Sequence, residues 1–362
     1  MTEHGSRISR VRDQMARQGV DTLLLSVGPD LPWLVGYEAM PLERLTMLVL
    51  PLDGDAHLIV PRLEAPRVDT SRGSFDLIAW DETDDPVELV ARMLPDRGTI
   101  AIGDRTWARF VVDLQRARPV LSWCRGSEVV GPVRIVKDDD EVAALARAAA
   151  AVDEIATAMR DVRFSGRSER DVHRELAERI SGAGHERLNF AIVAAGENAA
   201  SPHHEPGDRK IGDGDLVLCD FGGTMNRYCS DITRMFSVGE PPAEIVDAYE
   251  VLQAAQAAGV QAATVGVACE VVDTAARSVI GAAGYGEYFV HRTGHGIGAE
   301  EHEDPYIVAG NPTALVPGHA FSIEPGIYVP GRFGMRLEDI VVATVEGPRR
   351  LNHAQRDIAI VA

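Results

Sequence analysis

The chain has 362 residues, of which 45% are hydrophobic and 25% are charged, and its formal net charge is −19 at pH 7. This length predicts two domains, each with its own core. The acidic balance argues against a nucleic acid partner, because neutralising phosphates requires clustered Lys and Arg. No stretch reaches the roughly 18 apolar residues that span a bilayer, and the N-terminus lacks the apolar core of a signal peptide. We therefore expect a cytoplasmic protein with no membrane partner.

The first 131 residues predict an alternating α/β domain. The expected helices cover residues 6–18, 87–93 and 107–114, and the expected strands cover residues 22–27, 45–50, 56–60 and 99–102. The Asp53-Gly54 pair predicts a hairpin turn. This domain has no phosphate-binding loop and no recognisable chemistry. Trp33 and Tyr37 are interpreted as core residues, and a role in enclosing substrate is the alternative.

A domain boundary is expected at Gly131-Pro132, so that the second domain covers residues 132–362. Helices are predicted over residues 139–159, 243–263 and 269–282, and another begins at Ser168, whose hydroxyl is placed to cap it together with Asp171. Short strands separated by Gly, Pro and Asn follow Gly184. The second domain is therefore predicted as α+β, with helices packed on a largely antiparallel sheet.

The stretch from Leu216 to Val238, here called the first acidic hairpin, holds two aspartates on opposite sides of a turn. If the strands fold back about Met225 and Asn226, Asp220 lies directly opposite Asp231, with Cβ atoms about 5 Å apart. Two like charges at that distance repel strongly unless a cation lies between them. A pair of metal ions about 3.5–4 Å apart would fit.

The stretch from Phe321 to Val345, here called the second acidic hairpin, repeats this pattern. Folding back at Gly331 within Pro330-Gly331-Arg332 places Glu324 opposite Glu338. Two hairpins that each present a pair of acids indicate an internally duplicated domain.

Three histidines lie between the two acidic hairpins, at positions 291, 295 and 302. His295 stands between two glycines, which allow the backbone to approach a crowded site closely. Four carboxylates and one imidazole suit two divalent ions such as Mn²⁺, Co²⁺ or Zn²⁺. The four cysteines, Cys124, Cys219, Cys229 and Cys269, show no CxxC spacing and are predicted to be reduced and mostly buried.

The motifs DFGG, SDITR, GHGIG, IEPG and LED, taken in this order, resemble the five-ligand site of the pita-bread metallopeptidases, the group of methionine aminopeptidase, aminopeptidase P and prolidase. The α/β domain before them resembles the creatinase/prolidase N-terminal domain. The resemblance covers nearly the whole chain and points to the Xaa-Pro branch of the family. It implies a pita-bread catalytic domain with an internal pseudo-two-fold duplication.

The resemblance also implies roles for individual residues. Asp220 would bind one metal ion, Asp231 and Glu338 would bridge two, and His295 and Glu324 would bind the other. His203 and His302 match histidines beside the scissile bond, and His291 and Arg336 match supporting positions. Glu324 is suited to act as general base. Thr233 shares a face with Asp231 and is interpreted either as a hydrogen-bond donor to a ligand carboxylate or as an ordinary strand residue.

These roles predict a dimetal hydrolase for short peptides with proline in second place, acting as a homodimer. A dipeptidase of the prolidase kind is the first hypothesis and aminopeptidase P the alternative. The sequence departs from the dipeptidase pattern, because no arginine occurs between Pro305 and Arg332 to hold the substrate carboxylate; Arg332 and Arg336 are the candidates for that charge. A metal-independent creatinase-like hydrolase and a silent binding module are further alternatives, which the complete ligand set disfavours.

Overall fold

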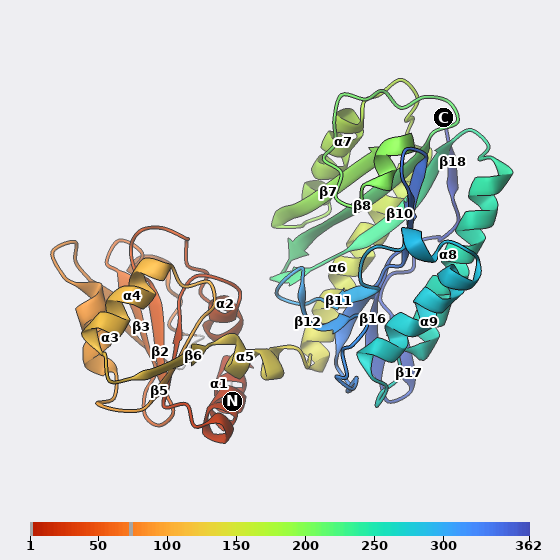
Figure 1. Ribbon diagram of the computed structural model, residues 1–362. Helices are drawn as coiled ribbons and strands as arrows, with labels where there is room; N and C mark the ends of the chain where they lie inside the picture. The colour runs from red at the N-terminus through yellow and green to blue at the C-terminus, as the bar shows by residue number, and fades with distance from the viewer. Residues whose placement is uncertain (1–2, 72–74) are drawn as a thin grey trace. The chain divides into compact units, whose positions relative to one another are not determined.

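The computed structural model describes residues 3–71 and 75–362 (Figure 1). The chain forms two units, Met1–Arg134 and Ile135–Ala362, which are described separately. The division falls after Arg134 rather than at Gly131-Pro132, because helix α5 (Ser127–Arg134) continues through Pro132 and closes the first unit.

The first unit has a six-stranded sheet in the order β4-β3-β2-β1-β5-β6. Its strands are β1 (Thr22–Leu25), β2 (Met47–Pro51), β3 (His57–Pro61), β4 (Asp76–Trp80), β5 (Thr99–Ile102) and β6 (Ser122–Arg125). Its other helices are α1 (Glu3–Gln18), α2 (Asp30–Val35), η1 (Ala65–Arg67), α3 (Pro86–Met93) and α4 (Ala108–Ala117). The expected α/β alternation is confirmed, and so is the β2-β3 hairpin, in which Gly54 has φ 97°.

Helices cover both faces of this sheet, because successive strand residues point to opposite sides. Leu23 and Leu25 pack with α1, α2 and α5, whereas Leu24 packs with α3 and α4. Trp33 and Tyr37 are buried in the first of these two cores, as the core interpretation predicted. The short helix α2, which contains Trp33, was not predicted from the sequence.

The second unit repeats the order helix, helix, strands. The first half holds α6 (Asp139–Ala158), η2 (Met159–Asp161), α7 (Glu169–Gly182), β7 (Arg187–Ala195), η3 (Gly196–Ala200), β8 (Leu216–Met225), β9 (Tyr228–Cys229) and β10 (Ile232–Val238). The second half holds α8 (Ala243–Ala262), α9 (Cys269–Ala282), η4 (Gly286–Tyr288), β11 (Gly294–Gly296), β12 (Glu303–Ile307), β13 (Ala320–Ile323), β14 (Gly326–Val329), β15 (Phe333–Arg336), β16 (Asp339–Thr344), β17 (Gly347–Arg350) and β18 (Ala359–Val361).

The helices of the second unit begin where the sequence predicts. Asp138 caps α6 and forms a capping box with Glu141, and Ser168 does the same for α7 with Asp171. In each box the side chain at the cap accepts from a backbone N–H that has no partner inside the helix, so the helix start is specified locally.

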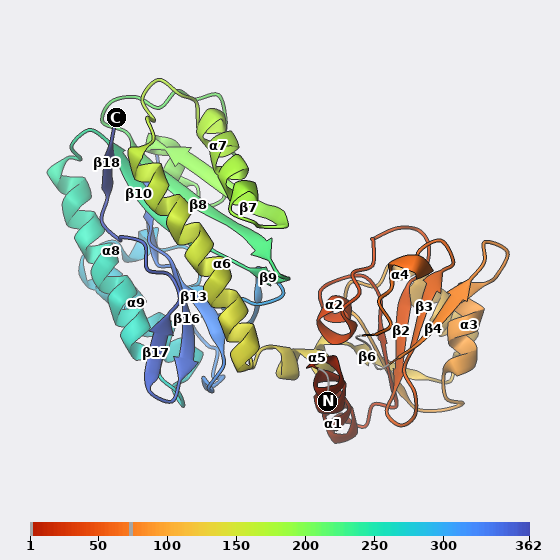
Figure 2. The same cartoon turned by 180° about the vertical axis from the view of Figure 1, so that it is seen from behind.

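Two sheets organise the second unit, in the orders β18-β10-β8-β7 and β12-β11-β13-β16-β17. Pairing is antiparallel except between β10 and β18. On β8, Val217, Cys219 and Phe221 pack with α6 and α7, which Figure 2 shows along the outside of this sheet. Leu216 and Leu218 face the opposite side, toward α8 and the β14-β15 hairpin. Asp220 continues this second face, so it points away from α6 and α7.

The predicted register of the first acidic hairpin is wrong by two residues. Asp220 lies opposite Thr233, not opposite Asp231, because the chain reverses at Asn226-Arg227 rather than at Met225-Asn226. Both turn residues have positive φ, 49° and 68°, as a two-residue hairpin turn requires. A displacement of two preserves the side-chain alternation, so Thr233 takes the place expected for Asp231 on the shared face.

The predicted register of the second acidic hairpin is confirmed. Ile323 lies opposite Asp339 in β13-β16, and Gly326 lies opposite Arg336 in β14-β15, about a turn that contains Gly331 with φ 71°. Glu324 and Glu338 occupy the short interruption between these two pairs of strands. In the described part of the chain, no helix combines the length and apolar character needed to cross a membrane.

Candidate metal centre

The five predicted ligands lie on or beside strands of the two sheets. Asp220 is within β8 and Asp231 immediately precedes β10, while His295 is the middle residue of β11. Glu324 follows β13, and Glu338 precedes β16. Asp231, His295 and Glu338 are at most 3% exposed and Asp220 is 6% exposed, an unusual degree of burial for carboxylates.

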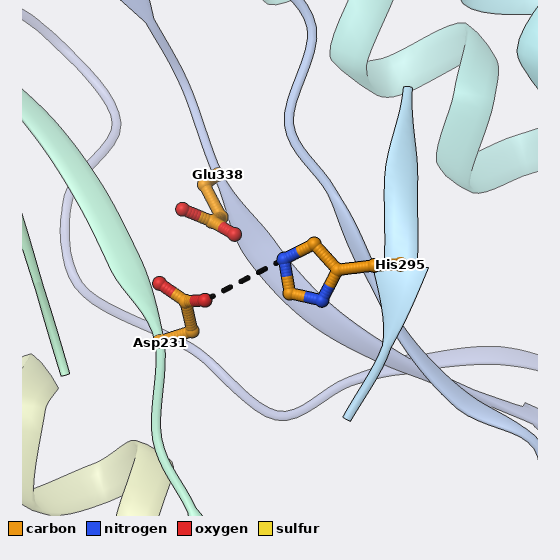
Figure 3. Close-up of side chains that lie close together, drawn as sticks. All are labelled: Asp231, His295 and Glu338. Carbon is orange, nitrogen blue, oxygen red and sulfur yellow. Dashed lines mark ion pairs between the residues drawn. The ribbon is translucent and has the colours of Figure 1, made fainter. Parts of the chain in front are cut away.

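Three of these residues converge on one point. One potential ligand atom from each of Asp231, His295 and Glu338 lies within 4.8 Å of the other two, and Figure 3 shows the three side chains directed toward one another. The Nε2 atom of His295 is 3.7 Å from Asp231 Oδ2 and 3.2 Å from Glu324 Oε1. Asp220 joins the cluster through Arg336, whose Nη2 donates to Asp220 Oδ2.

The glycines on either side of His295 are required by close backbone contact. A Cβ atom at Gly294 would lie 1.9 Å from the carbonyl oxygen of Ser322, and one at Gly296 would lie 2.2 Å from that of Asp304. The Ser322 hydroxyl accepts from the His295 backbone N–H and donates to Glu324 Oε1. This serine, which the sequence analysis did not single out, therefore connects the histidine to the glutamate.

The His295 ring is oriented as a ligand. Its Nδ1 lies 3.1 Å from the Gly296 carbonyl oxygen, which can only accept, so Nδ1 carries the proton. Nε2 is directed at the carboxylates of Asp231 and Glu324 and offers a lone pair to a cation whenever the imidazole is neutral. A lone pair and carboxylates directed at one another suit a cation that accepts from all of them.

Buried carboxylate oxygens test whether the site fits metal ions. Asp220 Oδ1, Asp231 Oδ1 and Glu338 Oε1 are buried and have no hydrogen-bond partner among the residues that the structure describes. Each such oxygen carries a large desolvation cost unless a cation or donor meets it. The donors are oxygens and one imidazole nitrogen, which suit divalent ions of the Mn²⁺, Co²⁺ or Zn²⁺ type. The residues therefore fit a divalent metal site.

The electrostatics of the protein groups alone are strained. Burial, together with repulsion from neighbouring carboxylates, raises the pKa of Asp231 and of Glu338 well above the usual values. Burial would also raise the pKa of Glu324, but His295, His291 and Arg336 oppose it and lower that pKa to about 2. Glu324 is therefore ionised at neutral pH and able to accept a proton.

Arg336 connects the two acidic hairpins. Its Nε donates to Thr233 Oγ1 at 3.1 Å and its Nη1 donates to the Tyr328 hydroxyl at 2.8 Å, in addition to the bond with Asp220. The Thr233 hydroxyl in turn donates to Glu338 Oε2 at 2.8 Å. Thr233 therefore donates to the carboxylate of Glu338, one of the five predicted ligands, and the ligand role of Glu338 stays a prediction.

His291 joins this hydrogen-bond network at Tyr328. Its Nδ1 donates to the Arg292 carbonyl oxygen, so its Nε2 accepts from the Tyr328 hydroxyl at 2.8 Å. Burial lowers the pKa of His291. His291 and Arg336 therefore meet through Tyr328, which sequence reasoning missed because an isolated strand tyrosine has no distinguishing motif.

His302 lies at the edge of the cluster, with its ring centroid 3.9 Å from that of His295. Burial, with the nearby His295, Arg292 and His203, lowers the pKa of His302 to about 4, so the ring is neutral at pH 7. Arg292 Nη2 donates to His302 Nδ1 at 3.3 Å, and since that nitrogen accepts, Nε2 carries the proton. His302 thus offers a neutral N–H donor.

The remaining predicted residues differ in accessibility. His203 is exposed on the loop after η3, close enough to His302 to contribute to the lowered pKa of that ring. The two cations proposed for a substrate carboxylate are both engaged: Arg336 by the contacts above, and Arg332 by Glu244 on the surface. The cation beside His302 is Arg292, which also stacks on Tyr306. Sequence reasoning missed Arg292, because the expected position of this cation lies after Pro305.

The chain belongs to metallopeptidase family M24, whose profile matches residues 143–345, and the Creatinase/Prolidase N-terminal domain matches residues 7–136. The predicted resemblance and fold class are thereby confirmed: a creatinase/prolidase-type domain precedes a pita-bread peptidase domain. Membership of this family implies divalent metal ions.

The proteins similar to this chain include both dipeptidases and an aminopeptidase. The chain is 41% identical to the probable dipeptidase PepE of Mycobacterium tuberculosis, over 99% of this chain and 96% of that protein. A prolidase structure from Thermococcus sibiricus has 35% identity and a TM-score of 0.92, with 99% of each chain covered. An X-Pro aminopeptidase structure from Thermotoga maritima has 28% identity and a TM-score of 0.86, covering 98% of this chain and 99% of that one.

Proposed function

We propose that this chain is a dimetal Xaa-Pro dipeptidase, which hydrolyses the bond between an N-terminal residue and a following proline. The observation that carries the proposal is the set of buried, unpartnered oxygens on Asp220, Asp231 and Glu338 around the His295 imidazole. Asp220, Asp231, His295, Glu324 and Glu338 would hold two divalent ions, with Mn²⁺ or Co²⁺ first and Zn²⁺ second. The homodimer and the cytoplasmic location predicted from the sequence stay predictions.

Divalent ions held there would polarise the scissile carbonyl and make water a stronger nucleophile near neutral pH. The ionised carboxylate of Glu324 takes the proton from the attacking water and returns it to the leaving nitrogen. The Nε2–H of His302 donates to the substrate carbonyl oxygen, where negative charge develops. His203 reaches the same bond from its exposed loop. A proline nitrogen has no N–H to recognise, so the site reads the carbonyl and the ring.

Arg292 supports the preference for dipeptides. A dipeptide places its carboxylate immediately after the proline, close to the scissile carbonyl, whereas a longer peptide has a neutral amide there. Arg292 provides a cation beside His302, the group assigned to that carbonyl. Aminopeptidase P activity on longer peptides remains the alternative, favoured by the likeness to an X-Pro aminopeptidase structure.

The test is hydrolysis of Xaa-Pro dipeptides and Xaa-Pro-Xaa tripeptides by protein stripped with a chelator and then supplied with Mn²⁺, Co²⁺ or Zn²⁺. We expect activity only after metal addition and a higher kcat/KM for dipeptides. Replacing Arg292 with Leu should raise KM for dipeptides and leave that for tripeptides nearly unchanged. Cleavage of tripeptides alone would establish the aminopeptidase reading, and full activity after metal removal would favour a creatinase-like hydrolase.

A further inference from the structure

Glu169 is a charged residue with no exposed surface, far along the chain from every predicted site residue. It is the first residue of α7, and its carboxylate accepts four hydrogen bonds. Oε1 accepts from the Ala195 backbone N–H at 2.9 Å and from Asn198 Nδ2 at 3.0 Å. Oε2 accepts from His204 Nε2 at 2.8 Å and from the Gly207 backbone N–H at 3.1 Å.

These four donors belong to one segment, residues 195–207, here called the His203 segment because it carries that histidine. Ala195 and Asn198 lie at its beginning, and His204 and Gly207 lie at its end. A single carboxylate therefore closes both ends of the segment on one point. The start of α7 is itself anchored, since Glu169 N–H donates to the Arg209 carbonyl oxygen and Arg170 N–H to that of Gly207.

The His203 segment also touches the second acidic hairpin. A Cβ atom at Gly334 in β15 would lie 1.7 Å from the Ala199 carbonyl oxygen, so the two backbones are in direct contact. Arg336 Nη1 also lies 3.4 Å from the Pro202 carbonyl oxygen, one residue before His203. The His203 segment therefore contacts both Glu169 and the second acidic hairpin.

The four hydrogen bonds require an ionised carboxylate. Burial would raise the pKa of Glu169, but the donors Asn198, His204, Ala195 N–H and Gly207 N–H lower it overall. A glutamine at this position offers one acceptor oxygen and one NH₂ group, and that NH₂ group would face two donors. Buried donors left without an acceptor are costly, so the segment would shift to regain partners.

We propose that Glu169 is a positioning residue for His203, which it places against the scissile bond by closing the His203 segment through His204 and the backbone of Ala195 and Gly207. The inference deepens the proposed function and rests on it for the role of His203. His204, interpreted from the sequence as an ordinary loop histidine, is then the side chain through which the carboxylate acts on its neighbour. Glu169 itself touches neither substrate nor metal.

The main experiment compares the Glu169→Gln variant with the wild type, both loaded with Mn²⁺. Because displacement of a catalytic group by about 1 Å can cost about a hundredfold in rate, we expect kcat to fall at least about tenfold while KM changes less than about threefold. Bound metal per chain should stay unchanged, since none of the proposed ligands contacts Glu169. Loss of metal together with activity would assign Glu169 a general structural role and overturn the proposal.

A second readout is independent of activity. Hydrogen exchange should become faster at the Ala195 and Gly207 amides in the metal-free Glu169→Gln protein, because both amides donate to that carboxylate. The His204→Ala variant removes one of the four bonds and serves if Glu169→Gln does not fold; it should show a smaller change in the same direction. Unchanged exchange across the segment in a folded variant would overturn the proposal.

A control variant and a double-mutant cycle distinguish a role in positioning His203 from a role in stability alone. Asp153 is also a buried carboxylate that accepts from a backbone N–H and a side-chain amide, those of His353 and Asn352, outside the His203 segment. Asp153→Asn should lower the melting temperature with less than about a twofold change in kcat. In the His203→Gln background, Glu169→Gln should have little further effect on kcat.

The outcomes distinguish the two proposals. If the wild type cleaves no Xaa-Pro peptide with any metal, the proposed function fails, whereas the hydrogen-exchange result still decides whether Glu169 closes the segment. If the wild type is active but Glu169→Gln or His203→Gln keeps full kcat, the positioning role fails and the proposed function stands. Fully additive effects in the cycle would also overturn it.

Discussion

The two acidic hairpins both present acids to the proposed metal site, but the sequence predicts the strand register of the second one better than that of the first. In the second, the predicted pairing about Gly331 matches the structure from Ala320 to Val342 apart from the interruption at the glutamates. In the first, the predicted pairing is displaced by two residues, and Asp231 lies in a break between β9 and β10. The difference lies in the turns.

A glycine in a turn indicates where the backbone can adopt a positive φ, whereas most other residues give no such indication. Gly331 has φ 71° at the turn of the second acidic hairpin, so its position in the sequence locates the reversal. The first acidic hairpin reverses at Asn226-Arg227, and Arg227 adopts φ 68° without any residue signal for it. Hairpin register can therefore be read from sequence only when the turn uses residues that prefer its backbone geometry.

The largest expected effect comes from removing one acid of each hairpin. Asp231→Asn and Glu338→Gln should each lower kcat about a thousandfold or more. Each variant removes a negative charge that would hold a metal ion, and the bound ion would stabilise the transition state by several kcal/mol. Metal per chain, measured by elemental analysis, should fall in both. The exposed acids that follow each hairpin give matched controls, Glu240→Gln and Glu346→Gln, which should keep full activity. A large effect in one hairpin only would break the equivalence of the pair.

A smaller effect is expected from the residue that joins the hairpins. Arg336→Lys keeps the charge but loses the three-way donation to Asp220, Thr233 and Tyr328, so kcat should fall and the metal Kd rise by about 10- to 100-fold. Arg332→Lys changes the same residue type in the same hairpin, where the partner is the exposed Glu244, and should leave both quantities unchanged. Equal metal binding in the two variants would contradict the role of Arg336.

The pH dependence of stability should expose the strain of the acids. Asp231 and Glu338 have raised pKa values when folded, so above about pH 4 these two carboxyls bind more protons in the folded metal-free protein than in the unfolded chain. Their contribution to the free energy of unfolding should therefore fall as pH rises from about 4 toward neutrality, whereas the lowered pKa values of His291 and His302 contribute in the opposite direction. Asp231→Asn should remove part of that downward slope and stabilise the metal-free protein relative to the wild type at pH 7.

Thermal unfolding with a chelator between pH 4 and 8 measures this slope. Saturating Mn²⁺ should raise the melting temperature of the wild type and raise that of Asp231→Asn far less. Ligand at a hundred times its Kd increases the free energy of unfolding by about 2.7 kcal/mol. A difference in stability between Asp231→Asn and the wild type that is no larger at pH 7 than at pH 4 would show that the acids are not strained.

The smallest expected effects are in the turns themselves. Arg227→Gly relieves a positive φ and should stabilise by about 0.5 kcal/mol after the entropy cost of glycine, whereas Gly331→Ala should destabilise by about 1 kcal/mol. A Cβ atom at Gly331 meets nothing within 4 Å, so any loss there reports backbone conformation alone. Denaturant titration of the metal-free protein measures both, and kcat should change less than about twofold. Opposite signs would overturn the explanation of the register error.

Much of the fold was predictable because its signals are local. The capping boxes at Asp138 and Ser168, the Asp53-Gly54 turn and the apolar strand β1 each depend on neighbouring residues alone. The helices α2 and α5 were missed because they are short, and α5 contains Pro132, which reads as a break. The residues around the proposed ligands, Tyr328, Ser322 and Arg292, had no motif and became visible only through their contacts.

The sequence by itself determined which residues are candidates for the chemistry: five acid or imidazole side chains in order, one histidine between two glycines, and the family that these motifs indicate. Only the tertiary structure decided how they meet, because burial and pairing join positions more than a hundred residues apart, as Arg336 joins Asp220. It also showed that Asp220 lies opposite Thr233, that Arg292 stands beside His302, and that Glu169 closes the His203 segment. Those contacts depend on the course of the folded chain between the two partners, which the motif around each residue does not encode.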